Sequence, residues 1–105
     1  MLLKKEVLIF LVLIALLTIS AGCKNNELVD ECRKACRGAL NSGRDLSEGP
    51  CLLDPMSNAE WVCDIAHKPR EAINNLRENQ CNAWHNGTAK HFIELTPNCE
   101  LIKIV

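Results

Sequence analysis

Several common signatures of function are missing from this sequence of 105 residues. Its 12 Lys and Arg residues are balanced by 13 Asp and Glu residues, so the basic surface that nucleic-acid binding requires is not indicated. The sequence has no Cys-x-x-Cys pair for thiol exchange, no Gly-x-Ser-x-Gly elbow for a nucleophilic serine and no glycine-rich phosphate loop. It also lacks internal repeats and low-complexity tracts. The composition therefore predicts one small domain and leaves its chemistry unspecified.

The chain begins with a segment that has the features of an export signal. Lys4 and Lys5 give the chain a positive start, an apolar run follows from Val7 to Leu17, and small residues at positions 20–22 end the segment. The apolar run is shorter than the about 20 residues that a membrane-spanning helix needs. We therefore interpret residues 1–22 as a signal peptide and residues 23–105 as a single cysteine-rich, extracytoplasmic domain.

Cys23 stands at the expected cleavage point. Through Lys4-Lys5, the apolar run and Ala21-Gly22-Cys23, the leader resembles the signal peptides of prokaryotic lipoproteins. The resemblance is confined to the leader, and it implies that Cys23 becomes the lipid-bearing first residue of a membrane-held product. Cleavage without lipidation, and retention of the leader as an anchor, are the alternatives.

The cysteine count supports lipidation. The chain has seven cysteines, and setting Cys23 apart leaves six, an even number that can form three disulfides. A small exported domain cannot build a large core, and such domains are commonly stabilised by disulfides. The sequence does not choose among the possible pairings of Cys32, Cys36, Cys51, Cys63, Cys81 and Cys99.

Residues 26–43 are predicted to form a helix. Apolar residues recur there at steps of three and four, Asn26 can cap the start, and Gly43 can end the helix. Cys32 and Cys36 lie one turn apart on the same face, so a bond between them is disfavoured. We expect each to pair with a cysteine beyond residue 50, which would fasten the helix to the rest of the domain.

The next part of the chain favours short strands. Residues 51–53 are apolar, and residues 61–65 contain β-branched and aromatic side chains in alternation. Residues 57–60 have the form of a capping box, so a short helix is the alternative for this region. A short helix is also predicted to start at Pro69.

Two hairpins are predicted after Cys81. The first turns at Asn86-Gly87, between strands at residues 82–85 and 89–93, and the second turns at residues 96–98. The predicted fold class is α+β, a small disulfide-rich domain with one long N-terminal helix packed on a small antiparallel sheet of three or four strands.

Outside the cysteines, three histidines are the only candidate metal set, with the carboxylates of Asp64 and Glu94 nearby in sequence. His67, His85 and His91 could ligate zinc or copper as neutral imidazoles, although none of them has the spacing of a His-Glu-x-x-His site. Surface or hydrogen-bonded histidines are the alternative. Zinc binding by the cysteines is disfavoured in an oxidising compartment, where disulfides form instead.

The polar segment of residues 64–71 is the densest cluster of potentially functional groups. Asp64 and His67 would be the centre of a small hydrolase if both side chains lined one cavity. A solvated turn is the alternative for this segment.

Two further motifs have ordinary structural explanations beside functional ones. Asn86-Gly87-Thr88 is an N-glycosylation sequence, with Asn86 as the possible acceptor, but Asn-Gly also serves a tight turn. The scarce aromatic residues Trp61, Trp84 and Phe92 are expected in the core and not on a ligand platform.

These observations favour a membrane-anchored, disulfide-stabilised extracytoplasmic module. We expect a non-catalytic binding or structural protein of the cell envelope, at the cell surface or in the periplasm. Its expected partners are the membrane, through a lipid at Cys23, and a protein or other envelope component, with no cofactor and no nucleic acid. A small secreted metal-binding protein using His67, His85 and His91 is the alternative.

Overall fold

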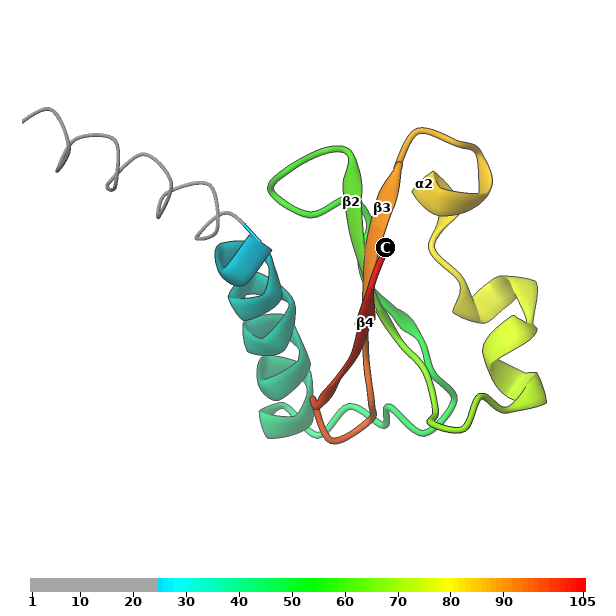
Figure 1. The fold of residues 1–105 in the computed structure, drawn as a ribbon. Helices are drawn as coiled ribbons and strands as arrows, with labels where there is room; N and C mark the ends of the chain where they lie inside the picture. The colour runs from blue at the N-terminus through cyan, green and yellow to red at the C-terminus, as the bar shows by residue number, and fades with distance from the viewer. Residues whose placement is uncertain (1–24) are drawn as a thin grey trace, which may run out of the picture.

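The computed structural model describes residues 25–105 (Figure 1). The predicted signal peptide (residues 1–22) and the predicted lipid site at Cys23 lie outside the described residues. Within residues 25–105, no helix has the length and apolar character needed to cross a membrane.

Residues 25–41 form a helix. Its buried residues Val29, Cys32 and Cys36 are three and four positions apart, so they share one face. Gly43 follows with a φ of 84°, which places it in the left-handed region where glycine commonly ends a helix. Asn26 lies within the helical residues, so the prediction that it caps the helix is wrong.

A mixed four-stranded sheet lies beside this helix, in the order β1-β2-β3-β4 (Figure 1). Strand β2 is antiparallel to β1, and β3 is antiparallel to β4, but β2 and β3 run parallel, with Asp64 opposite Glu94. The prediction of a purely antiparallel sheet is therefore wrong, whereas the α+β class is confirmed. The strands are β1 (Cys51–Leu53), β2 (Trp61–Ile65), β3 (His91–Leu95) and β4 (Leu101–Ile104).

The parallel pair requires a long connection, which is formed by residues 66–90. This crossover contains two 3-10 turns, η1 (Ala72–Asn75) and η2 (Arg77–Asn79), and one helical turn, α2 (Asn82–His85). The predicted helix after Pro69 is therefore a pair of 3-10 turns, and the predicted strand at residues 82–85 is wrong.

The two predicted hairpins had different outcomes. Asn86 and Gly87 end α2, where the Asn86 N–H donates to the Asn82 carbonyl, so they do not join two strands. The turn at residues 96–98 does join β3 to β4, as predicted. Strand β2 also forms as predicted, and not the helix that the capping-box pattern allowed.

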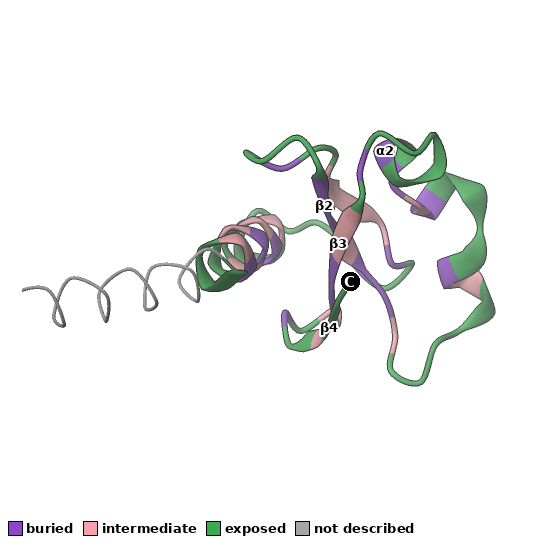
Figure 2. Ribbon diagram, turned by 45° about the horizontal axis from the view of Figure 1, so that its top comes forward, coloured by how far each residue is buried: buried purple, intermediate pink, exposed green. Residues whose placement is uncertain are grey.

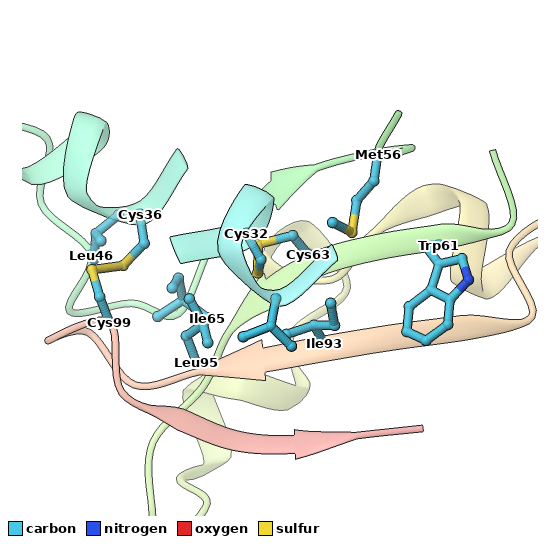
Figure 3. Packing of buried hydrophobic residues seen from close by; sticks show 11 residues of the cluster. Cys32, Cys36, Leu46, Met56, Trp61, Cys63, Ile65, Ile93, Leu95 and Cys99 are labelled. Atoms are coloured by element: carbon cyan, nitrogen blue, oxygen red, sulfur yellow. A yellow bond between two sulfur atoms is a disulfide. The ribbon is translucent and has the colours of Figure 1, made fainter. Parts of the chain in front are cut away.

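The main core lies between the helix and the sheet (Figures 2 and 3). Ile65, Ile93 and Leu95 are fully buried on the face of β2 and β3 that is turned toward the helix. Leu46 and Met56 come from loops and complete this core. Because this face is closed by the helix, the opposite face of the sheet is where a ligand site can form.

Three disulfides hold the domain together. Cys32 is bonded to Cys63 and Cys36 to Cys99, so both helix cysteines pair beyond residue 50, as expected (Figure 3). The third bond joins Cys51 to Cys81. Intramolecular disulfides in a domain of this size indicate an oxidising, extracytoplasmic environment.

Candidate functional site

A cavity of about 490 Å³ lies on the face of the sheet that is turned away from the helix; we call it the sheet cavity. Its position follows from strand alternation, because Cys63 and Ile65 point toward the helix and Val62 and Asp64 therefore point the other way. The floor of the cavity comes from three adjacent strands. It consists of Val62 and Asp64 from β2, Phe92 and Glu94 from β3, and Lys103 from β4.

The wall of the sheet cavity is formed by the crossover, with Gln80, Cys81, Trp84 and His85 at its centre. The Cys51–Cys81 disulfide ties this wall to the edge strand β1.

The carboxylate of Asp54, which directly follows β1, also holds the wall. The two oxygens of Asp54 accept the N–H groups of Asn82, at 2.7 Å, and Ala83, at 3.0 Å. These N–H groups belong to the first turn of α2 and have no partner within the helix, so Asp54 acts as its cap from a distant part of the chain.

Asn74 organises the other end of the crossover. It is 2% exposed, and its Oδ1 accepts the backbone N–H groups of His67, at 3.0 Å, and Glu71, at 3.1 Å. Those two bonds close the loop that carries Arg70 to the rim of the sheet cavity. The wall and the rim are thus held in place by the protein itself.

Glu94 is a buried charge in the cavity floor, with a side chain only 5% exposed. Its Oε2 accepts a hydrogen bond from Arg70 at 2.7 Å, and its Oε1 lies 3.6 Å from the Lys103 ammonium. Two cationic side chains therefore compensate one buried carboxylate.

Asp64, the neighbour of Glu94 in the parallel register, lacks such compensation. Its Oδ1 is buried and has no hydrogen-bond partner among residues 25–105. Burial raises the pKa of Asp64 to about 8, and the nearby Glu94 carboxylate adds to the rise. A hydrogen bond from the Ile65 backbone and the charge of Arg70 act in the opposite direction. Asp64 is consequently a neutral carboxylic acid at pH 7.

The raised pKa makes the stability of the domain depend on pH. Between the usual pKa of 3.8 and about 8, Asp64 is protonated when folded and ionised when unfolded. Folding therefore takes up a proton, and the contribution of Asp64 to stability is present in full below pH 3.8 and is lost as the pH rises to 8.

We expect Asp64→Asn to remove this loss. The free energy of unfolding of the parent should fall as the pH rises from 5 to 8, whereas that of the variant should not. The difference between the two should therefore grow by up to about 1.4 kcal/mol for each pH unit in this range. Urea unfolding with the disulfides intact measures it. Asp45→Asn is the matched control, because a hydrogen bond from Ser47 lowers the pKa of exposed Asp45, which is thus ionised throughout this range. Parallel pH profiles for the parent and Asp64→Asn would contradict the assignment.

The three histidines do not meet. His67 lies beside Asn74, 3.2 Å from its Oδ1, and His91 stacks on Trp61 with 4.5 Å between the ring centroids. His85 contacts Gln80 at the wall of the sheet cavity. Over residues 25–105, no cluster of three or more His, Cys, Asp or Glu side chains is arranged to hold a metal ion. The described residues therefore do not form the metal site that was the alternative for His67, His85 and His91.

Asp64 and His67 are also separated. Asp64 lines the sheet cavity, whereas His67 lines a different hollow, together with Glu71 and residues 96–98. Residues three positions apart in the polar segment of residues 64–71 thus line different surfaces. The geometry does not bring together the pair on which the hydrolase hypothesis depends.

The aromatic residues divide between the two faces of the sheet. Trp61 is 9% exposed and belongs to the helix-side core, as expected. Trp84 is 39% exposed and lines the sheet cavity, where it meets Phe92 edge-to-face at 4.7 Å between centroids. The expectation that Trp84 is a core residue is wrong.

Sequence reasoning did not place Glu94 or Lys103 in a common site with Asp64, whereas Arg70 lies within the polar segment of residues 64–71 that it singled out. A signal was available for Glu94, because it is an acidic residue flanked by Ile93 and Leu95 in a mostly apolar strand. Its neighbours across the sheet depend on the strand order, which the sequence did not reveal.

Asn86 is exposed at the end of α2, and its Oδ1 accepts hydrogen bonds from both the backbone N–H and the hydroxyl of Thr88. Its glycosylation stays a prediction. No protein family, curated protein or solved structure matches the chain.

Proposed function

We propose that this chain is an exported, lipid-anchored and non-catalytic binding module of the cell envelope, at the cell surface or in the periplasm, with the sheet cavity as its binding site. The leader of residues 1–22 and the position of Cys23 support export and anchoring. The membrane, through that lipid, and a further envelope component are its partners. The disulfides support an oxidising compartment.

The observation that carries the binding role is the construction of the sheet cavity. It combines an exposed Trp84, the ring of Phe92 and a buried Asp64 oxygen that has no hydrogen-bond partner within residues 25–105. Its volume falls in the range of about 300–1,000 Å³ that is typical of small-ligand sites. A disulfide and the Asn74 hydrogen bonds support its wall and rim from behind. Preorganisation of this kind lowers the entropic cost of binding.

We expect Trp84→Ala to abolish capture of an envelope component. The experiment crosslinks envelopes of cells that express the full chain and compares the adducts of Trp84→Ala with those of the parent. Leu40→Ala is the matched control, because Leu40 is 41% exposed but lies on the helix, away from the cavity. Adducts should survive in Leu40→Ala and fall at least about tenfold in Trp84→Ala.

Cys23→Ser tests the anchor in the same cells, since the protein should then leave the membrane fraction. Equal adduct yields from the parent, Trp84→Ala and Leu40→Ala would contradict the cavity as the binding site. Retention of Cys23→Ser in the membrane fraction would contradict the lipid anchor.

A further inference from the structure

The cationic side chains of the sheet cavity, Arg70 and Lys103, already contact other groups of the protein. All three guanidinium nitrogens of Arg70 donate hydrogen bonds: Nε to Asn75, one terminal nitrogen to Glu94 and the other to the Asn74 carbonyl. Lys103 faces Glu94 and lies 5.4 Å from the centre of the Phe92 ring. An anionic ligand would have to compete with Glu94 and with the oxygens of Asn74 and Asn75 for these cations, which disfavours it.

A cationic ligand is disfavoured for the opposite reason. The carboxylate of Glu94 is compensated by two cations, and Asp64 carries no charge at neutral pH. The ligand would therefore meet the excess positive charge of Arg70 and Lys103. The cavity suits a ligand without net charge.

The remaining capacity of the cavity is for hydrogen bonds. A protonated carboxyl group such as that of Asp64 has one O–H donor and acceptor lone pairs. A hydroxyl group has the same combination, so it can both accept from and donate to Asp64. Since Asp64 Oδ1 has no partner among residues 25–105, a ligand hydroxyl would satisfy a buried polar atom.

Trp84 gives the cavity an apolar surface beside the hydrogen-bonding group of Asp64. Its indole is partly exposed at the cavity wall and is supported from one side by Phe92. An indole is a large, rigid and amphipathic surface. A sugar ring presents C–H groups on its faces and hydroxyl groups around its edge, and so it can contact an indole and a carboxyl group at once.

We infer that the sheet cavity binds a neutral carbohydrate, with a sugar ring against Trp84 and its hydroxyl groups on Asp64. The inference rests on the proposed function and names the chemical class of the ligand. The cavity volume of about 490 Å³ leaves room for more than one sugar ring, so short oligosaccharides are the suitable probes.

The test is calorimetric titration of the full chain, held in a detergent without a sugar headgroup. The probes are maltotriose, cellotriose, mannotriose and triacetylchitotriose, with spermidine and citrate as the cationic and anionic comparisons. We expect at least one trisaccharide to bind, and both Trp84→Ala and the similarly sized Asp64→Leu to weaken it about tenfold or more. Leu40→Ala should leave the affinity unchanged.

The dependence on pH gives a second readout. Glu94, Lys103, Arg70 and His85 are the charged or titratable groups that face Asp64 around the cavity. A neutral sugar that accepts a hydrogen bond from the O–H of the Asp64 carboxyl should bind equally well at pH 6 and 7 and more weakly as the pH passes 8. For spermidine, in contrast, affinity would rise with pH as Asp64 ionises.

The outcomes separate the ligand class from the proposed function. Binding of spermidine or citrate without any trisaccharide would overturn the carbohydrate inference, and so would no binding by any probe. If crosslinking to an envelope component still depends on Trp84 in that case, the sheet cavity remains the binding site and only the ligand class is wrong. If crosslinking does not depend on Trp84, the proposed function itself fails.

Discussion

Removing the Cys51–Cys81 disulfide by the double substitution Cys51→Ala/Cys81→Ala is expected to destabilise the domain and also to disrupt the sheet cavity. The bond closes a loop with a sequence separation of 30 residues. In the chain-entropy description, loss of such a bond lowers the free energy of unfolding by about 4 kcal/mol. For a small domain this is a large part of the total stability.

The effect on the cavity follows from where the bond lies. Cys81 lines the cavity, next to Gln80 in the wall that buries Asp64. Without the bond, the wall keeps the two hydrogen bonds to Asp54 and the packing of Ala83 and Ala89 near Val62 but loses its covalent link to β1, and we expect it to open. Water then reaches Asp64, and its pKa falls from about 8 toward the usual 3.8.

The matched control is Cys36→Ala/Cys99→Ala. That bond spans a separation of 63 residues, so its removal should also cost about 4 kcal/mol. It fastens the helix to the connection between β3 and β4, and neither of its cysteines lines the cavity, so its removal leaves the cavity wall in place. Urea unfolding gives the two free energies, and NMR titration of the Asp64 carboxyl carbon gives the pKa, with trimethylamine oxide added if either variant unfolds. An unchanged pKa of Asp64 in Cys51→Ala/Cys81→Ala would mean that the disulfide does not maintain the cavity.

The sequence predicted the parts of the fold that local patterns control. The apolar spacing of Val29, Cys32 and Cys36 identified the helix and showed which face is buried. The even cysteine count, with Cys23 set apart, predicted three disulfides. The β-branched and aromatic residues of β2 indicated a strand in spite of the capping-box pattern before it.

The predictions that were wrong, the strand at residues 82–85 and the antiparallel sheet, concern features that depend on contacts between distant parts of the chain. Residues 82–85 precede Asn86-Gly87, a strong local signal for a hairpin, yet they form a helical turn because Asp54 caps its N–H groups from 28 residues away. No local pattern contains that contact. Once these residues are a helical turn, the crossover can return the chain to the starting edge of β2, and β3 pairs with it in parallel.

The sequence-based prediction of the candidate site was incomplete for the same reason. The parallel register places Asp64 beside Glu94, and the crossover places Trp84 in the wall of the same cavity, so the cavity exists only after the strand order is settled. The polar segment of residues 64–71 was correctly singled out, since Asp64 and Arg70 belong to the cavity. His67, by contrast, was paired with Asp64 on proximity in sequence alone, and the end of β2 lies between them.

The second large effect is expected at Gly49, a residue whose role is visible only in the structure. Gly49 has a φ of 73°, and a Cβ added there would overlap the side-chain nitrogen of Asn74 and lie 2.8 Å from the Ile65 carbonyl oxygen. Gly49→Ala therefore adds overpacking against Asn74 to the backbone strain of a left-handed residue. We expect it to lower the free energy of unfolding by about 3–4 kcal/mol.

Gly43→Ala separates these two contributions. Gly43 has a φ of 84° but no atom within 4 Å of an added Cβ, so the substitution there carries the backbone strain alone, about 1 kcal/mol. Both free energies come from urea unfolding under the same conditions. Because Asn74 also closes the loop that carries Arg70, Gly49→Ala should displace that loop and perturb the Arg70–Glu94 contact, whereas Gly43→Ala should not. Equal losses at the two glycines would show that Asn74 moves aside freely, and the rim of the sheet cavity would then be less rigidly built than the hydrogen bonds of Asn74 indicate.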